Sequence, residues 1–170
     1  GKHSVEKILN ADEVMKSPGI PEKAAMVKKI RSAGIAVVSE IEFAFRFKGD
    51  SKIIAITGSN GKTTTTALTF HLCSTAGLDA AMVGNIGASF ARQVAVHPKD
   101  LYVVEVSSFQ LDDIKHFKPD VAILTNITED HLDRYDYQFE NYIRSKFRIV
   151  MNQQQDDFFI FCADDEITMK

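Results

Sequence analysis

The sequence has little net charge, few cysteines and no long apolar run, and each shortage excludes a class of function. A net charge of −3 gives no electrostatic reason to expect nucleic acid or an anionic membrane as a partner. The apolar runs are far too short to span a bilayer, and residues 1–3 do not open a signal peptide, so a cytoplasmic protein is expected. Cys73 and Cys162 lie far apart in the sequence. We expect both to be reduced thiols in a hydrophobic core.

The length of 170 residues permits one sizeable core, or one domain together with part of another. A hydrophobic content of 45% and a charged content of 25% are ordinary for a globular protein. The chain begins with Gly1 rather than methionine and ends at Lys170, where a helical pattern has just begun. We therefore expect it to be a piece of a longer protein.

The first part of the chain predicts a small α/β unit. Two short strands are expected at residues 11–15 and 35–38, with a helix at residues 21–33 between them. Pro21 suits the first turn of that helix, and Gly34 suits its end. Ser39 and Glu42 have the spacing of a capping box, which predicts a second short helix that reaches about Phe47.

The pattern changes at Gly49-Asp50-Ser51, and this break predicts a division into domains of residues 1–48 and 49–170. Beyond it, strand and helix patterns alternate. Strands are predicted at residues 52–56, 80–83, 101–106, 121–124 and 158–162, and long helices at 62–76 and 139–151. The apolar runs scarcely alternate with polar residues, which is typical of strands buried on both faces of a parallel sheet. The fold class is therefore α/β, with a doubly wound, mostly parallel sheet.

A glycine-rich loop follows the first strand of this second part and opens a helix. Its sequence is Thr57-Gly58-Ser59-Asn60-Gly61-Lys62-Thr63-Thr64, and these residues are called the phosphate loop below. Glycines let several backbone N–H groups point at one anion, and the helix N-terminus adds partial positive charge. Lys62 is expected to reach the β- and γ-phosphates of a nucleotide, and Thr63 to bind Mg²⁺. Ile56 stands where the usual motif has its first glycine, and the alternative interpretation is a turn that only caps a helix.

Two polar residues lie where predicted strands end. Glu105 closes an otherwise apolar strand, and a buried carboxylate is usually paired or bound to a metal. Because ligands gather at the carboxyl ends of parallel strands, Glu105 is a candidate Mg²⁺ ligand beside the phosphate loop. His131 follows the next strand along the chain and is predicted to lie at the same edge. A partly exposed strand end for Glu105 and a solvated loop side chain for His131 are the structural alternatives.

Lys146 is unusual because it falls within an apolar stripe of its predicted helix. Tyr142 and Ile143 precede it by four and three residues, which places all three on one helix face. Either the lysine extends along the edge of the stripe to reach solvent, or its amine is buried, held neutral and made reactive.

Together these segments resemble the Mur ligase family of ATP-dependent amide ligases. The phosphate loop is similar to the family's loop, including the missing first glycine, and three further motifs follow in the family's order: Gly84-Asn85-Ile86-Gly87, Glu105-Val106-Ser107-Ser108-Phe109-Gln110-Leu111 and Thr125-Asn126-Ile127-Thr128-Glu129-Asp130-His131-Leu132-Asp133. Ser-Ser-Phe-Gln-Leu within the second motif, and the run Ser17-Pro18-Gly19-Ile20-Pro21, are similar to the member that adds D-glutamate to UDP-N-acetylmuramoyl-L-alanine in peptidoglycan synthesis.

The resemblance implies a role for each matching position. Lys62 would stabilise the transferring γ-phosphoryl group of ATP, and Thr63 and Glu105 would hold one Mg²⁺. His131 would bind a second Mg²⁺, next to a Lys146 carboxylated at N6 by CO₂. Residues that match muramoyl-substrate contacts are Asn85, Ser107 and Gln110, with Ser17 and Gly19 near the UDP moiety. The remaining phosphate-loop positions, Gly58, Ser59, Asn60, Gly61 and Thr64, would contact the nucleotide.

The resemblance also sets expectations for the whole molecule. Residues 1–48 would end a UDP-substrate-binding, Rossmann-like domain, and residues 49–170 would begin the central ATP-binding domain. We expect an inactive fragment of a monomeric enzyme, because the family's C-terminal domain helps to hold ATP and D-glutamate. Another Mur ligase, a folylpolyglutamate synthase or a non-catalytic nucleotide-binding module remain as alternatives.

Overall fold

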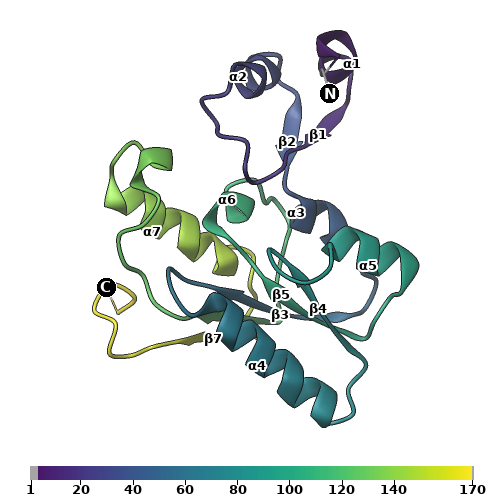
Figure 1. Ribbon diagram of the computed structural model, residues 1–170, viewed down its shortest axis with the longest axis vertical. Coiled ribbons are helices and arrows are strands. Elements are labelled where there is room, and N and C mark those ends of the chain that lie inside the picture. The colour runs from purple at the N-terminus through teal and green to yellow at the C-terminus, as the bar shows by residue number, and fades with distance from the viewer. Residues whose placement is uncertain (1–3, 170) are drawn as a thin grey trace.

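The computed structural model describes residues 4–169 (Figure 1). Within this range the molecule contains two parallel sheets and the helices that pack around them. The expectations that concern residues 1–3 and Lys170 fall outside this range. The smaller sheet pairs β1 (Glu13–Met15) with β2 (Ala36–Val38), and helices α1 (Val5–Leu9) and α2 (Ala25–Ser32) lie beside it. Among the described residues, no helix is both long and apolar enough to cross a membrane.

The larger sheet has five strands in the order β4-β5-β3-β6-β7, and every neighbouring pair is parallel. The strands are β3 (Lys52–Thr57), β4 (Ala80–Gly84), β5 (Leu101–Glu105), β6 (Val121–Leu124) and β7 (Phe158–Phe161). The predicted α/β fold with a doubly wound parallel sheet is therefore confirmed. The central position of β3 places the end of this strand beside the ends of both β5 and β6.

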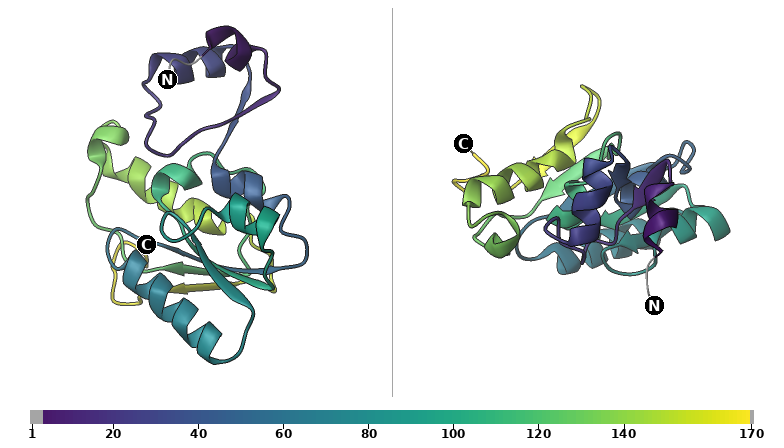
Figure 2. Two further views of the ribbon diagram at one scale, coloured as in Figure 1. Left: turned by 45° about the vertical axis from the view of Figure 1, so that its right-hand side comes forward. Right: turned by 90° about the horizontal axis from the view of Figure 1, so that it is seen from above.

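Helices cover both faces of the larger sheet (Figures 1 and 2). On one face lies α4 (Lys62–Thr75). On the other lie α3 (Glu40–Phe45), α5 (Phe90–Val96), α6 (Ser108–Leu111) and α7 (Phe139–Phe147), with the 3₁₀ turns η1 (Leu132–Arg134) and η2 (Arg148–Val150) at the two ends of α7. The smaller sheet lies beyond this second helical layer, on the side away from α4. Near the carboxyl ends of β4 and β5, the loop at Pro18 and Gly19 from the first part of the chain therefore meets loops of the second part.

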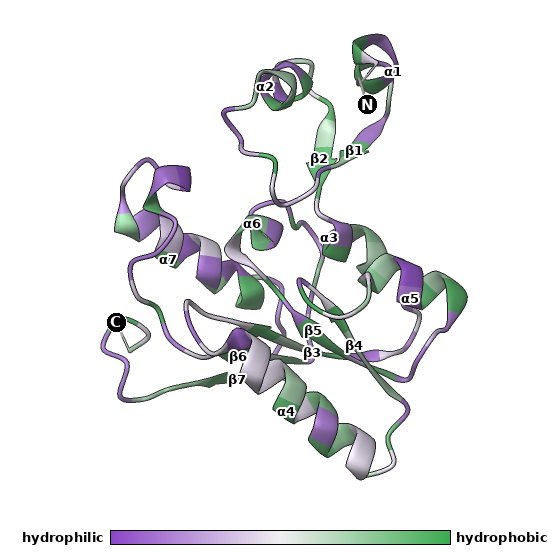
Figure 3. Ribbon diagram, in the orientation of Figure 1, coloured by the Kyte–Doolittle hydropathy of each residue, from purple (hydrophilic) through white to green (hydrophobic). Residues whose placement is uncertain are grey.

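The hydrophobic core lies between the larger sheet and its second helical layer. All five residues of β5 are buried, which agrees with the unbroken apolar run of this strand (Figure 3). Ile41 and Ala44 of α3 pack in the same cluster as Ile53 of β3. Thus α3 packs on the larger sheet although it precedes the predicted domain division at Gly49, and that division itself stays a prediction.

Several predicted element boundaries were wrong. Pro21 does not begin a helix, because α2 starts at Ala25 and the preceding backbone forms a loop. Gly34 does follow the end of α2, with a φ of 72° that suits glycine. Ser39 caps α3, but the Glu42 carboxylate does not complete a capping box. It accepts hydrogen bonds from the backbone N–H groups of residues 115–117, and although burial alone would raise the pKa of Glu42, these bonds lower it.

Three short helices, α1, α5 and α6, were not predicted from the sequence. Helix α7 ends at Phe147 and continues only as the 3₁₀ turn η2, so the predicted single helix over residues 139–151 was wrong in its last turn. Both cysteines are free thiols, as expected, but Cys162 is exposed just after β7 and Cys73 is only partly buried. The prediction of two core thiols was therefore wrong.

Candidate functional site

The phosphate loop joins the end of β3 to the start of α4. Gly58 has a φ of 149°, and a Cβ at this position would collide with the Thr125 side chain. Gly61 has a φ of 81° and forms the N-cap of α4. Glycine is therefore needed at Gly58 for close approach to a neighbouring strand end and at Gly61 for a left-handed conformation. The result is a helix N-terminus that opens at the edge of the sheet.

The end of β6 supports this loop from one side. The Asn60 backbone N–H donates to Asn126 Oδ1 at 3.0 Å, and the Ser59 hydroxyl donates to the Thr128 carbonyl at 2.9 Å. Ser59 is buried, and its hydroxyl also lies 3.1 Å from the Tyr142 hydroxyl. These contacts fix the loop through the Ser59 side chain and the Asn60 backbone.

Lys62, Thr63 and Thr64 open α4 beside the loop. The Lys62 ammonium donates to the carbonyls of Gly58 and Ser59, each at 2.9 Å. It therefore lies folded over the loop, where an anion would meet it. Thr63 and Thr64 are exposed.

Glu105 is the residue on which three elements converge. Its side chain is buried, and its two oxygens accept hydrogen bonds from the Thr63 hydroxyl and the Asn85 amide, both at 2.8 Å. The register explains the meeting, because Glu105 lies opposite Ile56 of β3 and Gly84 of β4. The carboxylate thus lies next to the hydroxyl that opens α4. An oxygen pair of this kind fits Mg²⁺, which takes few protein ligands and completes its shell with phosphate oxygens and water.

Lys146 is 1% exposed, so its place in the apolar stripe reflects burial and not a path to solvent. Its ammonium donates to the Gly58 carbonyl at 2.6 Å and lies 5.1 Å from the Tyr142 ring centroid. Burial, and secondarily the positive charge of Lys62, lower the pKa of Lys146 to about 7. The reactive interpretation needs a buried amine whose pKa is lowered, and Lys146 meets both conditions beneath the phosphate loop. Carboxylation of Lys146 stays a prediction.

His131 lies above the same region with an exposed side chain. Its φ of 51° is left-handed, and its ring centroid lies 5.1 Å from that of Phe109. No cluster of three or more histidine, cysteine, aspartate or glutamate side chains within residues 4–169 has metal-binding geometry. Lys146 lines the same cavity as His131, and a protonated lysine there would repel a cation, so a second metal site fits these residues better when the lysine becomes an anion.

A cavity of about 260 Å³ brings together some of the predicted residues, whereas Glu105, Thr63 and the other phosphate-loop residues apart from Lys62 are not part of its lining. Its lining comes from both parts of the chain: Pro18, Gly19, Lys62, Asn85, Ser107, Ser108, Phe109, Asp130, His131, Tyr142 and Lys146. A second cavity, of about 310 Å³, shares Pro18 and Asn85 with it and adds Ser17 and Gln110. The predicted substrate residues therefore fall in two adjoining cavities. A cavity of about 560 Å³ between α2 and α7 contains none of them.

Ser107 and Gln110 have a structural role as well. They form a capping box at the start of α6, in which Gln110 Oε1 accepts the Ser107 N–H at 3.0 Å. Sequence reasoning missed the contributions of Phe109 and Tyr142 to the site. Phe109 lies inside a quoted motif, but its contacts come from residues distant in sequence and leave no local signal.

Residues 56–170 match the family model of the Mur ligase middle domain. The chain is 59% identical over 165 residues to the UDP-N-acetylmuramoylalanine–D-glutamate ligase of Christiangramia forsetii, and 56% identical over 167 residues to that of Bacteroides fragilis. These alignments cover 97% and 98% of this chain but 37% of each relative. The chain therefore spans little more than a third of the length of these relatives.

Solved structures share the fold at lower identity. UDP-N-acetylmuramate–alanine ligase from Thermotoga maritima has a TM-score of 0.60 at 22% identity, over 98% of this chain and 39% of that one. A UDP-N-acetylmuramate:L-alanyl-γ-D-glutamyl-meso-diaminopimelate ligase from Neisseria has a TM-score of 0.65 at 18% identity, over 94% of this chain and 54% of that one. The MurF ligase of Thermotoga maritima, solved with ADP, has a TM-score of 0.60 at 18% identity, over 95% of this chain and 49% of that one.

Proposed function

This chain belongs to the Mur ligase family, and we propose that it serves an ATP-dependent ligase that joins D-glutamate to UDP-N-acetylmuramoyl-L-alanine. The observation that carries the proposal is the contact of Glu105 with Thr63 and Asn85 at the mouth of the phosphate loop. It joins a nucleotide-binding loop, a carboxylate for a metal and a substrate-facing amide in one place. The curated relatives named above are ligases of this specificity.

ATP binding is assigned to the phosphate loop. Backbone N–H groups at the start of α4 would surround the phosphates, and Lys62 would leave its two carbonyl acceptors for the γ-phosphoryl oxygens. Thr63 and Glu105 would hold Mg²⁺ on the side of β5. His131 and a carboxylated Lys146 would hold a second Mg²⁺. When bound, Mg²⁺ would supply the positive charge that allows two anions to approach each other.

The reaction proposed for the whole enzyme proceeds in two steps. The carboxylate of UDP-N-acetylmuramoyl-L-alanine attacks the γ-phosphorus of ATP, which gives an acyl phosphate and ADP. The amine of D-glutamate then attacks the acyl carbon, phosphate leaves, and an amide forms with loss of a proton. Lys62 stabilises the charge that develops on the transferring group. Asn85, Ser107 and Gln110 orient the muramoyl substrate, and the loop at Ser17 and Gly19 lies near its UDP moiety. We expect the enzyme to be monomeric and cytoplasmic.

The test is an assay of phosphate release by the whole ligase that we propose contains this chain. With UDP-N-acetylmuramoyl-L-alanine and ATP present, we expect release to require D-glutamate and not L-lysine, diaminopimelate or L-alanine. Lys62→Ala should lower turnover at least about a hundredfold, because its charge acts on the transition state. Lys28→Ala, an exposed lysine on α2, is the matched control. Release driven equally by another amino acid would refute the assigned specificity.

A further inference from the structure

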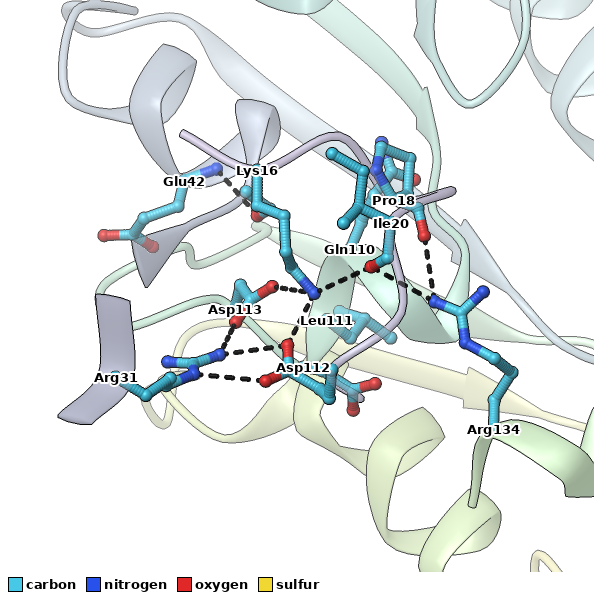
Figure 4. A network of polar contacts seen from close by, with 12 residues as sticks. Lys16, Pro18, Ile20, Arg31, Glu42, Gln110, Leu111, Asp112, Asp113 and Arg134 are labelled. Carbon is cyan, nitrogen blue, oxygen red and sulfur yellow. Dashed lines mark hydrogen bonds and ion pairs between the residues drawn. The ribbon is translucent and has the colours of Figure 1, made fainter. Parts of the chain in front are cut away.

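Arg134 of η1 reaches from the larger part of the molecule to the loop that follows β1, called here the Pro18 loop (residues 17–21). Its Nη2 donates to the carbonyls of Pro18 at 3.2 Å and Ile20 at 3.4 Å (Figure 4). One guanidinium thus binds two carbonyls of a segment more than a hundred residues away. The carbonyls belong to the loop that lines the site cavity with Pro18 and Gly19.

The Pro18 loop is held from its other side by Lys16. The Lys16 ammonium donates to the same Ile20 carbonyl at 3.4 Å and to Glu22 at 2.6 Å, and it lies 3.0 Å from Asp113 Oδ2. Lys16 is buried, so its position is fixed. The loop is therefore bound by two cations, Lys16 and Arg134. Of these two, Arg134 also contacts Phe109, which lines the site cavity.

The other contacts of Arg134 lead to His131. The guanidinium carbon lies 4.3 Å from the Phe109 ring centroid, and the Phe109 ring lies 5.1 Å from the His131 ring. The Arg134 backbone N–H also donates to the His131 carbonyl at 2.9 Å, in the turn where His131 adopts its left-handed conformation. Arg134, Phe109 and His131 thus form a continuous chain of contacts, of which Phe109 and His131 line the cavity.

We propose that Arg134 is a positioning residue of the ligase, one that fixes the Pro18 loop and the His131 ring relative to each other across the cavity. The substrate role of this inference rests on the proposed function. Arginine suits the task because its planar guanidinium can donate in its plane to two carbonyls while it stacks on an aromatic ring. A lysine ammonium would keep the charge but lose the stack. Substrate bound under the Pro18 loop would then meet a His131 ring that is already oriented.

The structural part is tested by NMR of the His131 ring in the full 170-residue chain. Phe109→Leu removes the ring current and supplies the reference position of the His131 signals. In Arg134→Met and Arg134→Lys we expect these signals to shift toward that reference, because Phe109 loses the group that orients it. Arg144→Met is the matched control, since Arg144 is exposed on α7 and has no polar contact in the described part of the chain. Unchanged His131 signals in both Arg134 variants would overturn the proposal.

The substrate part is tested by kinetics of the whole polypeptide. In Arg134→Lys we expect the KM for UDP-N-acetylmuramoyl-L-alanine to rise about tenfold, as for the loss of the stacking contact between the guanidinium and Phe109. The KM for ATP should stay within about twofold, because no contact joins Arg134 to the phosphate loop among residues 4–169. Equal KM changes for both substrates would refute a positioning role.

The NMR and the kinetic experiments distinguish a failure of the proposed function from a failure of the role proposed for Arg134. If the wild-type enzyme releases no phosphate with D-glutamate, the proposed function fails, while the NMR result still decides whether Arg134 orients His131. If Arg134→Met loses the dispersed amide spectrum of a folded chain, Arg134→Lys decides the NMR arm, since its charge can still satisfy the loop carbonyls.

Discussion

Among single residues, Glu105 links the phosphate loop to the sheet most directly, through its contact with Thr63. Glu105→Gln keeps the shape and the acceptor for Asn85 but removes the charge that a cation needs. We expect the gain in ADP affinity that Mg²⁺ provides to fall about 10- to 100-fold, while metal-free ADP binds almost as before. Calorimetry of the chain with and without Mg²⁺ measures both affinities. Glu140→Gln, exposed on α7, is the control, and an undiminished Mg²⁺ effect in Glu105→Gln would exclude Glu105 as a ligand.

Lys146 gives a second prediction at this scale. A neutral amine attacks CO₂, a C–N bond forms and a proton is released. With a pKa of about 7 the buried amine is largely neutral at pH 8, whereas an exposed lysine, with a pKa of about 10.4, is largely protonated. At constant dissolved CO₂, carbamate on Lys146 should therefore rise as the pH passes through 7.

The measurement uses ¹³C-labelled bicarbonate and NMR of the carbamate carbon. Lys146→Met should remove one signal, whereas Lys28→Met, which changes an exposed lysine, should leave every signal that forms near pH 8. An identical spectrum from the Lys146 variant would show that the buried amine is inert under these conditions.

At the scale of elements, the close approach of β4 and β5 determines where Glu105 lies. Gly84 ends β4 with a φ of 104°, and a Cβ there would collide with the Glu105 carbonyl. We expect Gly84→Ala to destabilise the chain by more than about 2 kcal/mol, since left-handed strain and a backbone clash add. Gly77→Ala is the control, with a φ of 82° but open space around it, and should cost only the left-handed strain of about 1 kcal/mol. Urea unfolding measures both, and equal costs would mean that the backbone clash relaxes.

The strands could be predicted because burial on both faces leaves a local signal. β5 is apolar up to Glu105, and the polar residue at its end was identified for the same reason. Short α6 has no periodicity to detect, since it spans four residues and depends on its Ser107 cap. The helix predicted from Pro21 failed because the Ile20 carbonyl and its neighbours bind Lys16 and Arg134, contacts that no local pattern encodes.

In the candidate site, single residues could be predicted from local patterns, whereas their contacts with one another could not. Lys62 and Glu105 follow from motif position, and Lys146 from its place in an apolar stripe. The pairing of Glu105 with Asn85 could not be predicted, because it depends on the register of β4 against β5. The stack of Arg134 on Phe109 likewise depends on how η1 packs against α6.

At the scale of the whole molecule, polar contacts join the smaller sheet to the larger one. The buried residues Val27, Ile30 and Val37 of the smaller unit belong to neither hydrophobic cluster in the part of the chain that the structure describes. Asp113, which follows α6, instead contacts two cations of the smaller unit (Figure 4). Arg31 donates to its Oδ1 at 2.5 Å, and Lys16 lies 3.0 Å from its Oδ2. Asp113 is thus a buried carboxylate through which the two sheets are connected, in addition to the contacts of Arg134 with the Pro18 loop.

Because Asp113 contacts two cations, we expect even a substitution that keeps its volume to lower the free energy of unfolding strongly. Asp113→Asn keeps the volume of the side chain but leaves the buried Lys16 facing a neutral amide, with Glu22 as its remaining partner. We expect a loss of about 3 kcal/mol in the free energy of unfolding, because removing one member of a buried pair leaves the other charge desolvated. Asp79→Asn, which breaks the exposed pair with Lys99, should cost less than about 1 kcal/mol.

Salt distinguishes the two pairs further. Buried charges are screened much less than exposed ones, so the cost of Asp113→Asn in urea unfolding should barely change between low and high ionic strength, whereas the small cost of Asp79→Asn should shrink. A cost at Asp113 that fell with salt to the level of the control would mean that solvent reaches this carboxylate. The contacts of Asp113 with Lys16 and Arg31 would then weaken as salt is added.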